Sequence, residues 1–229
     1  MKQIRQLSRP LILSMAAASV IAFPLTASAD DTGFYAGTNV GINLQQDQDS
    51  DGSPNRDLEL DFDNGAFYSG QVGYKFNDYG PGRFRTEFEL SYRDNDVDNI
   101  TFNNNPQVGN GEQDVLAGLV NVYYDFTNVS EKFVPFVGVG VGFAEIDSSV
   151  SYNNGNATLN DSDTAFAYQA VIGTEYKLTD KISLVGDARY FALDNPELTR
   201  FGGPAPAQFT DLDSEYDSFT ISAGLRYSF

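Results

Sequence analysis

Apolar and polar residues alternate along eight segments of this chain, as they do in strands with one apolar and one polar face. In the last segment Phe219, Ile221 and Leu225 share one parity, whereas Ser222 and Arg226 take the other. The eight segments cover residues 34–44, 66–76, 83–93, 116–126, 133–144, 166–178, 182–190 and 218–229. Each is about ten to twelve residues long, which suits a tilted strand that crosses a bilayer.

The connections between these segments alternate in length. Residues 77–82, 127–132 and 179–181 are short, whereas 45–65, 94–113, 145–163 and 192–217 are long and rich in Asn, Asp, Gly and Pro. The pattern predicts an all-β fold: an eight-stranded antiparallel transmembrane β-barrel of the up-and-down type, with short periplasmic turns and four long extracellular loops. Leu58, Leu60 and Phe62 continue the parity of Ala66, so we expect the second strand to extend above the membrane.

The alternation does not decide which face points outward. A soluble up-and-down barrel of the lipocalin type would place the apolar face inside. The Tyr and Phe near the strand ends, the alternating loop lengths and the terminal Phe229 favour the membrane barrel, in which aromatic girdles mark both interfaces.

Residues 1–29 have the pattern of a cleaved signal peptide. A leader with three Lys or Arg precedes a largely apolar stretch, and Ala27-Ser28-Ala29 matches an A-x-A cleavage site. The alternative, an uncleaved membrane anchor, needs roughly 20 apolar residues, and only about a dozen are present. Cleavage would leave residues 30–229 as one barrel domain.

The predicted mature chain is strongly acidic. It holds 11 Lys and Arg against 32 Asp and Glu, a formal charge of −21. Such a field repels nucleic acid, so that class of partner is excluded. No further run of about 18 apolar residues follows the leader, which excludes a helical membrane protein.

The chain contains the motifs Gly33-Phe-Tyr-Ala-Gly37, Asn121-Val-Tyr-Tyr-Asp-Phe126, Pro135-Phe-Val-Gly-Val-Gly-Val-Gly142, Tyr168-Gln-Ala-Val-Ile-Gly-Thr-Glu-Tyr176 and Gly224-Leu-Arg-Tyr-Ser-Phe229. In these motifs it resembles the small OmpA-like and opacity-type outer-membrane β-barrel family. The resemblance implies export through the periplasm and a multi-pass barrel in the bacterial outer membrane. It also implies three partners: outer-membrane lipid, lipopolysaccharide, and a barrel-assembly machinery that reads Tyr227 and Phe229 as its signal. The motifs specify architecture rather than chemistry.

The polar face of the strands carries many charges. An eight-stranded barrel is just wide enough for its own side chains to fill it, so charges inside must pair with one another. We expect an interior charge network formed by Arg83, Arg85, Glu87, Glu89, Arg93, Glu175, Lys177, Asp187, Arg189 and Arg226. The alternative is a narrow ion path that the same charges gate.

Histidine is absent from the chain. The membrane-barrel lipases, deacylases and proteases that this architecture resembles use a catalytic His as general base, so we expect no enzyme. The remaining candidate is the carboxylate pair Glu87 and Glu89. Arg83, Arg85 and Arg93 surround that pair in sequence, which indicates charge neutralisation rather than acid–base chemistry.

Asp47, Asp49 and Asp51 match the start of a calcium-binding loop, because alternate carboxylates suit a hard cation. The match then fails, since position twelve is Leu58 and the acid Glu59 comes one residue late. A solvated acidic loop and a weak calcium site are both open, and we expect no other cofactor.

These patterns predict a non-enzymatic outer-membrane surface protein. Its role would be structural or adhesive, exerted by acidic extracellular loops on a receptor of a host or another surface. A narrow, porin-like ion channel is the alternative function.

Overall fold

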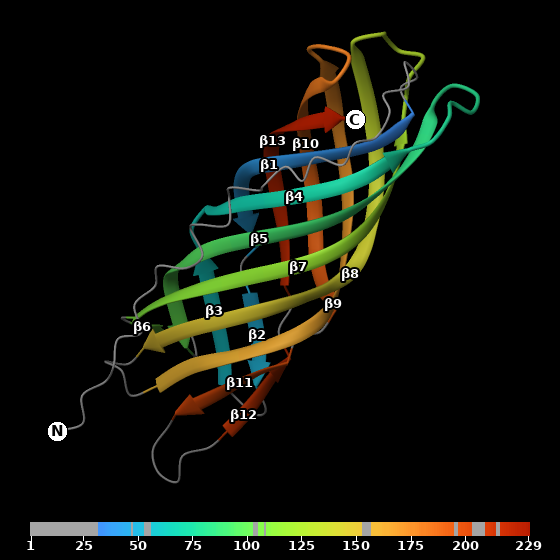
Figure 1. The fold of residues 1–229 in the computed structure, drawn as a ribbon. Helices are drawn as coiled ribbons and strands as arrows, with labels where there is room; N and C mark the ends of the chain where they lie inside the picture. Colours follow the sequence, from blue (N-terminus) through green and yellow to red (C-terminus); the bar gives the residue numbers. More distant parts are fainter. Residues whose placement is uncertain are drawn as a thin grey trace, which may run out of the picture.

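The computed structural model describes residues 32–46, 48–52, 56–102, 105–107, 109–152, 157–194, 197–202, 209–213 and 216–229. These residues form thirteen strands joined in one antiparallel sheet (Figure 1). Among them, no helix is long and apolar enough to cross a bilayer. The predicted signal peptide, residues 1–29, lies outside the described part of the chain.

Eight of the strands close into a ring. In the order of their pairing they are β1 (Gly33–Gln45), β4 (Gly65–Lys75), β5 (Arg83–Phe102), β7 (Gly109–Asp125), β8 (Phe133–Tyr152), β9 (Ala157–Lys177), β10 (Ile182–Asp194) and β13 (Tyr216–Ser228). The ring closes because β13 pairs with β1 from Tyr35–Ser228 to Gln45–Ser218. This is the predicted eight-stranded antiparallel barrel, and closure leaves no unpaired strand edge in this part of the wall.

The strands are longer than predicted, because most of the expected extracellular loops continue the barrel wall. The β8–β9 pairing runs from Phe133–Tyr176 to Tyr152–Ala157, so most of 145–163 is strand. The long connection predicted at 145–163 is therefore a paired extension of the two strands over its described residues. Beyond Ala144 the alternation inverts, so that Ile146 faces inward and Glu145 outward, and the neighbouring strand supplies the hydrogen-bond partners that the backbone needs.

Four short strands extend the barrel wall outward from the ends of β1, β4, β10 and β13. They are β2 (Gln48–Gly52), β3 (Arg56–Phe62), β11 (Glu197–Gly202) and β12 (Phe209–Asp213), and a three-residue strand, β6 (Asn105–Gln107), pairs with β5. The pairings β5–β3, β3–β2, β2–β12, β12–β11 and β11–β9 extend the wall beyond β1, β4, β10 and β13. The expected extension around Leu58 and Phe62 is thus present as a separate strand, β3, paired with β5.

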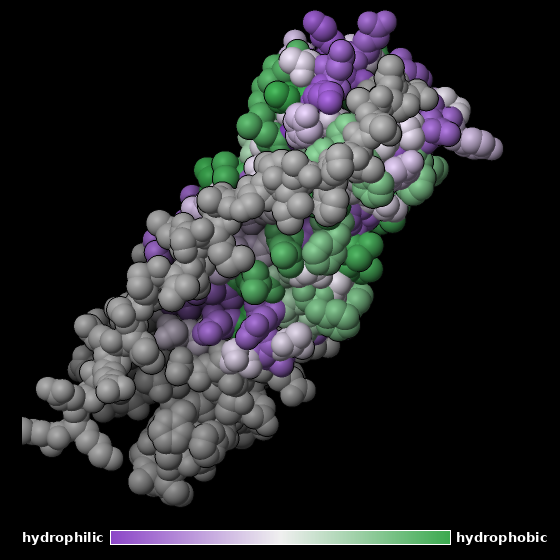
Figure 2. Space-filling view, viewed as in Figure 1, coloured by the Kyte–Doolittle hydropathy of each residue, from purple (hydrophilic) through white to green (hydrophobic). Residues whose placement is uncertain are grey.

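The apolar face of the ring points outward. Val40, Val139 and Ile172 expose 59%, 64% and 63% of their surface, whereas Arg85 and Asn121 on the opposite face expose none. Figure 2 shows apolar residues along the side of the barrel and polar residues at the end that carries the short turns. A soluble lipocalin-type barrel would have the reverse arrangement, so that alternative is wrong.

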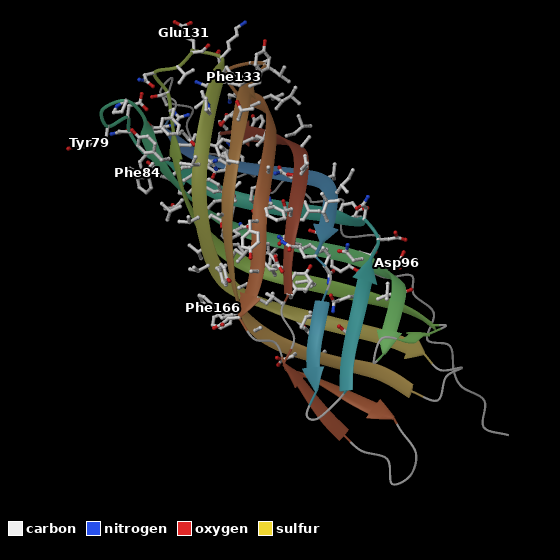
Figure 3. All side chains as sticks on the ribbon, turned by 180° about the vertical axis from the view of Figure 1, so that it is seen from behind. Tyr79, Phe84, Asp96, Glu131, Phe133 and Phe166 are labelled. Atoms are coloured by element: carbon white, nitrogen blue, oxygen red, sulfur yellow. The ribbon has the colours of Figure 1, made fainter. Side chains whose placement is uncertain are left out.

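Aromatic side chains form a girdle near each end of the apolar surface. At the short-turn end, Phe84 meets Tyr124 with ring centroids 5.1 Å apart, and at the other end Phe143 meets Phe166 at 5.9 Å. Figure 3 shows Phe84 near the short turns and Phe166 farther along the barrel. These two girdles mark the two membrane interfaces. Directly beyond the second girdle the outward positions are acidic, and this acidic rim consists of Asp94, Asp96, Glu112, Asp114, Glu145, Asp147, Asp194 and Asp217.

Candidate functional site: the barrel lumen

The inward face of the barrel collects buried charged side chains, which we call the lumen network. Its members are Lys75, Arg83, Arg85, Glu87, Glu89, Asp125, Glu175, Asp187, Arg189 and Arg226, all buried. Of the ten residues that the sequence placed inside, Arg93 is also buried but stands apart, and Lys177 is half-buried at the end of β9. Lys75 and Asp125 were not predicted, although both lie on the polar parity of their strands.

β5 supplies the largest share of the network because charged residues occupy its odd positions. Arg83, Arg85, Glu87 and Glu89 follow one another on the inner face, and each exposes 4% or less of its surface. The even positions, such as Phe84 and Phe88, are half exposed on the outside. Strict period-two alternation over this strand therefore separates charge from lipid.

Near the short turns, Arg85 is the centre of the network. Its Nε donates to Asp125 Oδ1 at 2.8 Å, and its Nη1 lies 3.2 Å from Glu87 Oε2. The Tyr35 hydroxyl donates to the same Glu87 oxygen at 2.7 Å, and the Arg85 guanidinium lies 3.7 Å from the centre of the Tyr123 ring. Both carboxylates are thus charge-paired and hydrogen-bonded, which is the condition under which buried charges are tolerated.

Two ion pairs cross the full width of the lumen. β5 and β10 occupy opposite places in the eight-stranded ring, and so do β4 and β9. Arg189 of β10 nevertheless reaches Glu89 of β5 at 2.9 Å, and Lys75 of β4 reaches Glu175 of β9 at 3.1 Å. Arg226 also contacts Glu175, at 2.5 Å. These bridges join opposite strands across the lumen at two positions along the barrel.

Glycines on β8 make room for the side chains that lie across the lumen. A Cβ atom at Gly138 would run into the Tyr123 ring, and one at Gly140 would meet Asn121 Oδ1. Asn121 in turn accepts a hydrogen bond of 2.8 Å from Gln169. The motif of alternate Gly in β8 is therefore a packing requirement of the lumen.

Beyond the lumen network, Arg93 apart, the buried side chains of the described residues are uncharged. Gln45 of β1 donates to Gln113 of β7, which donates to Ser148 of β8 at 2.8 Å. Beside these amides lies a buried apolar cluster that consists of Val97, Val115, Ala117, Leu119, Ala144, Ile146, Ala165, Ala167, Phe191, Leu193 and Tyr216. A hydrated ion that had passed the charged layer would meet this apolar layer next.

Glu87 and Glu89 are two positions apart on β5, as an acid–base pair would require. Glu87 is held by Arg85 and Tyr35, and Glu89 accepts two hydrogen bonds from Arg189. Each carboxylate thus has a fixed cationic partner, and the arrangement neutralises charge rather than presenting a proton donor and acceptor to a substrate.

The other predicted sites lie at the two ends of the barrel. Asp47 is outside the described residues, whereas Asp49 and Asp51 lie in β2, paired in register with Glu59 and Asp57 of β3. The described backbone there is a strand rather than a turn. At the other end, the Tyr227 and Phe229 rings pack edge to face at 5.4 Å, and the Phe229 N–H donates to the Phe34 carbonyl.

Comparison with known proteins identifies the family to which this barrel belongs. Residues 13–229 match the family model described as the outer membrane protein beta-barrel domain. The outer membrane protein PagN of Salmonella typhimurium is 30% identical over 231 residues, which cover 92% of this chain and 95% of PagN.

Two solved structures have a similar fold. The outer membrane protein OprG of Pseudomonas aeruginosa superposes with a TM-score of 0.62 at 14% identity, over 87% of this chain and 97% of OprG. The outer membrane protease OmpT of Escherichia coli superposes with a TM-score of 0.56 at 8% identity, over 90% and 99% of the two chains. At such identities the similarity concerns the fold alone.

Proposed function

Because the chain belongs to the outer membrane protein beta-barrel family and is an outer-membrane protein, we propose that it is a non-enzymatic surface protein with a structural or adhesive role. The observation that carries this proposal is the filled lumen. Arg189–Glu89 and Lys75–Glu175 cross its whole width, so the barrel is a scaffold rather than a conduit. The activity then resides on the surface that faces the medium.

The extracellular part of the wall supports a role in contact with another surface. Long strands such as β8 and β9 carry the barrel well beyond the aromatic pair Phe143 and Phe166, and β2, β3, β11 and β12 complete that extension. A hydrogen-bonded wall presents its outer end with little conformational freedom, which lowers the entropic cost of binding. Its acidic rim favours a cationic or cation-bridged partner on the receptor side.

The absence of an enzymatic role is supported by composition and by pairing. The whole chain contains no His, and Glu87 and Glu89 are each held by an Arg. The similarity to the protease OmpT rests on 8% identity and therefore carries no activity to this chain.

Attachment of bacteria to epithelial monolayers and to an abiotic surface tests the proposed function. The variants replace residues 47–62, 195–215, or both, by short Gly/Asn turns, with heat-dependent gel mobility as the control for a folded barrel. We expect attachment to fall at least several-fold while the barrel stays folded. Unchanged attachment by the doubly trimmed barrel would contradict an adhesive role.

A narrow channel is the second candidate, and one observation favours it: the inner face of β5 is polar without interruption from Arg83 to Asn95. Single-channel recording of the protein extracted from membranes tests it. Discrete openings that change with charge reversal at Arg85 or Glu87 would establish a pore and contradict the scaffold proposal. We expect no stable openings, because the cross-lumen ion pairs and the apolar cluster both oppose a hydrated ion.

The partners follow from the location. We propose lipid and lipopolysaccharide around the apolar surface, the assembly machinery at Tyr227 and Phe229, and a receptor at the outer end. Weak calcium binding at Asp47, Asp49 and Asp51 would link this end to lipopolysaccharide phosphates. Calorimetry with calcium compares the native chain with a variant carrying Asn at all three positions, and equal heats would remove the calcium site.

A further inference from the structure

The buried charges of the barrel do not balance. Among the residues that the structure describes, the buried cations are Lys75, Arg83, Arg85, Arg93, Arg189 and Arg226, and the buried anions are Glu87, Glu89, Asp125, Glu175 and Asp187. Six positive charges thus face five negative ones. An uncompensated charge in a dry interior is costly, so the excess needs a counter-charge.

The positive charge that lacks a buried counter-charge is that of Arg93. The ion pairs of the lumen network join every buried carboxylate to Lys75, Arg83, Arg85, Arg189 or Arg226. Arg93 is fully buried, and its hydrogen bond within the described residues joins Nη1 to Ser91 Oγ at 3.0 Å. Its guanidinium lies over two rings instead, 3.7 Å from the centre of Phe191 and 5.1 Å from that of Phe67.

The two remaining nitrogens of Arg93 form one edge of the guanidinium. Nε and Nη2 both lack a hydrogen-bond partner among the residues that the structure describes. Their N–H groups point to the same side in the plane of the group, which is the fork that holds a carboxylate or another anion. The aromatic rings stabilise the face of the cation but cannot accept these in-plane hydrogen bonds.

Two hydroxyl groups lie near the ring of Phe191, which Arg93 also contacts. The Tyr216 ring meets Phe191 edge-on with centroids 6.0 Å apart, on the ring that Arg93 also covers. Tyr216 Oη and Ser218 Oγ are buried there and lie close enough to interact with each other. Hydroxyl groups can turn their hydrogens toward an anion, so they suit the same ligand.

We propose that Arg93 holds a small monovalent anion, a halide or a carboxylate, inside the barrel between the lumen network and the apolar cluster. One negative charge balances the count of six cations and five anions. The anion accepts hydrogen bonds from Nε and Nη2 of Arg93, and it occupies part of the lumen. This assignment does not depend on whether the surface function is adhesive, because it concerns the interior of the barrel.

Crystallography with bromide tests the site directly. The full chain is expressed, extracted from outer membranes in detergent and crystallised in sodium bromide. We expect an anomalous peak within hydrogen-bonding distance of Arg93 Nε and Nη2. Wild-type crystals without such a peak would overturn the proposal in favour of water at the fork.

Unfolding measurements provide a second test with matched variants. A ligand that binds only the folded state raises the unfolding midpoint as its concentration rises. At constant ionic strength, the wild-type midpoint should rise when bromide replaces a bulky organic anion. Arg93→Met should lose this response, and Arg93→Lys, which keeps the charge without the fork, should weaken it.

Arg226→Met is the control, because it removes a lumen Arg that already contacts Glu175. That variant should be less stable than wild type but should keep the bromide response. A bromide response in Arg93→Met equal to that of wild type would contradict the proposal, as would its loss in Arg226→Met alone.

Discussion

Arg189 Nη1 on β10 donates hydrogen bonds to both carboxylate oxygens of Glu89 on β5, at 2.9 and 3.0 Å, from the opposite side of the ring. Asp187 Oδ1 accepts a further hydrogen bond from Arg189 Nε at 2.9 Å. One guanidinium thus ties two carboxylates together across the centre of the barrel. The link is short because an eight-stranded barrel leaves room for little more than its own side chains.

Glu89→Gln should destabilise the barrel by about 3 kcal/mol, because breaking a buried ion pair leaves a charge without its full compensation. The midpoint of urea-induced unfolding in detergent, followed by gel mobility, measures the change. Glu145→Gln is the control, since this outward carboxylate is exposed beyond the second girdle. Equal stability of the two variants would show that the cross-lumen bridge contributes little.

Gly138→Ala should destabilise the barrel by about 1–3 kcal/mol, because the added methyl group collides with the Tyr123 ring. Gly70→Ala is a matched change on β4, where a Cβ atom meets nothing within 4 Å. The folded fraction after refolding in detergent measures both. We expect a loss for Gly138→Ala alone, and similar yields would contradict the packing role of the β8 glycines.

Ile172→Arg should cost about 2–4 kcal/mol, since the residue is 63% exposed midway between the two girdles, where a charge faces lipid tails. Glu145→Arg, beyond the second girdle, should cost about 1 kcal/mol or less. Unfolding titrations in lipid vesicles compare the two variants. The same cost at both positions would contradict the assigned position of the membrane.

Phe229→Ala should lower the amount of folded protein in the outer membrane several-fold while leaving the stability of purified protein almost unchanged, because the terminal residue is proposed as an assembly signal. Phe76→Ala removes another exposed girdle aromatic, 44% exposed, without touching the terminus. Membrane fractions probed for heat-shifted protein give the result. An equal loss of folded protein in both variants would show that Phe229 acts as a girdle aromatic rather than as an assembly signal.

Several features of the fold follow from local sequence alone. The alternation along residues 83–93 correctly assigned Phe84 and Phe88 to one face and Arg85 and Glu87 to the other, since the side-chain period of a strand is two whatever its neighbours are. The strand count, the short turns and the barrel topology followed from repeating that pattern. Beyond Ala144 the pattern inverts, since Ile146 is buried inside whereas Glu145 and Asp147 face outward, and the β8–β9 pairing continues to Tyr152 and Ala157.

The partners within the charge network do not follow from local sequence. Lys75 and Asp125 lie on the polar face of their strands, but the sequence did not assign them to the network. Only the closed ring shows that Lys75 lies opposite Glu175, one hundred residues later, and that Asp125 lies beside Arg85.

The sequence by itself determined which side chains share a face of each strand, because strand periodicity is a local property. The aromatic residues near the strand ends and the alternating loop lengths favoured lipid on the apolar side. The tertiary structure decided which inward charges meet, how far the wall extends beyond the membrane, and that Arg93 has no carboxylate partner among the described residues. Those outcomes depend on strand register and on closure of the ring, which bring together residues far apart along the chain.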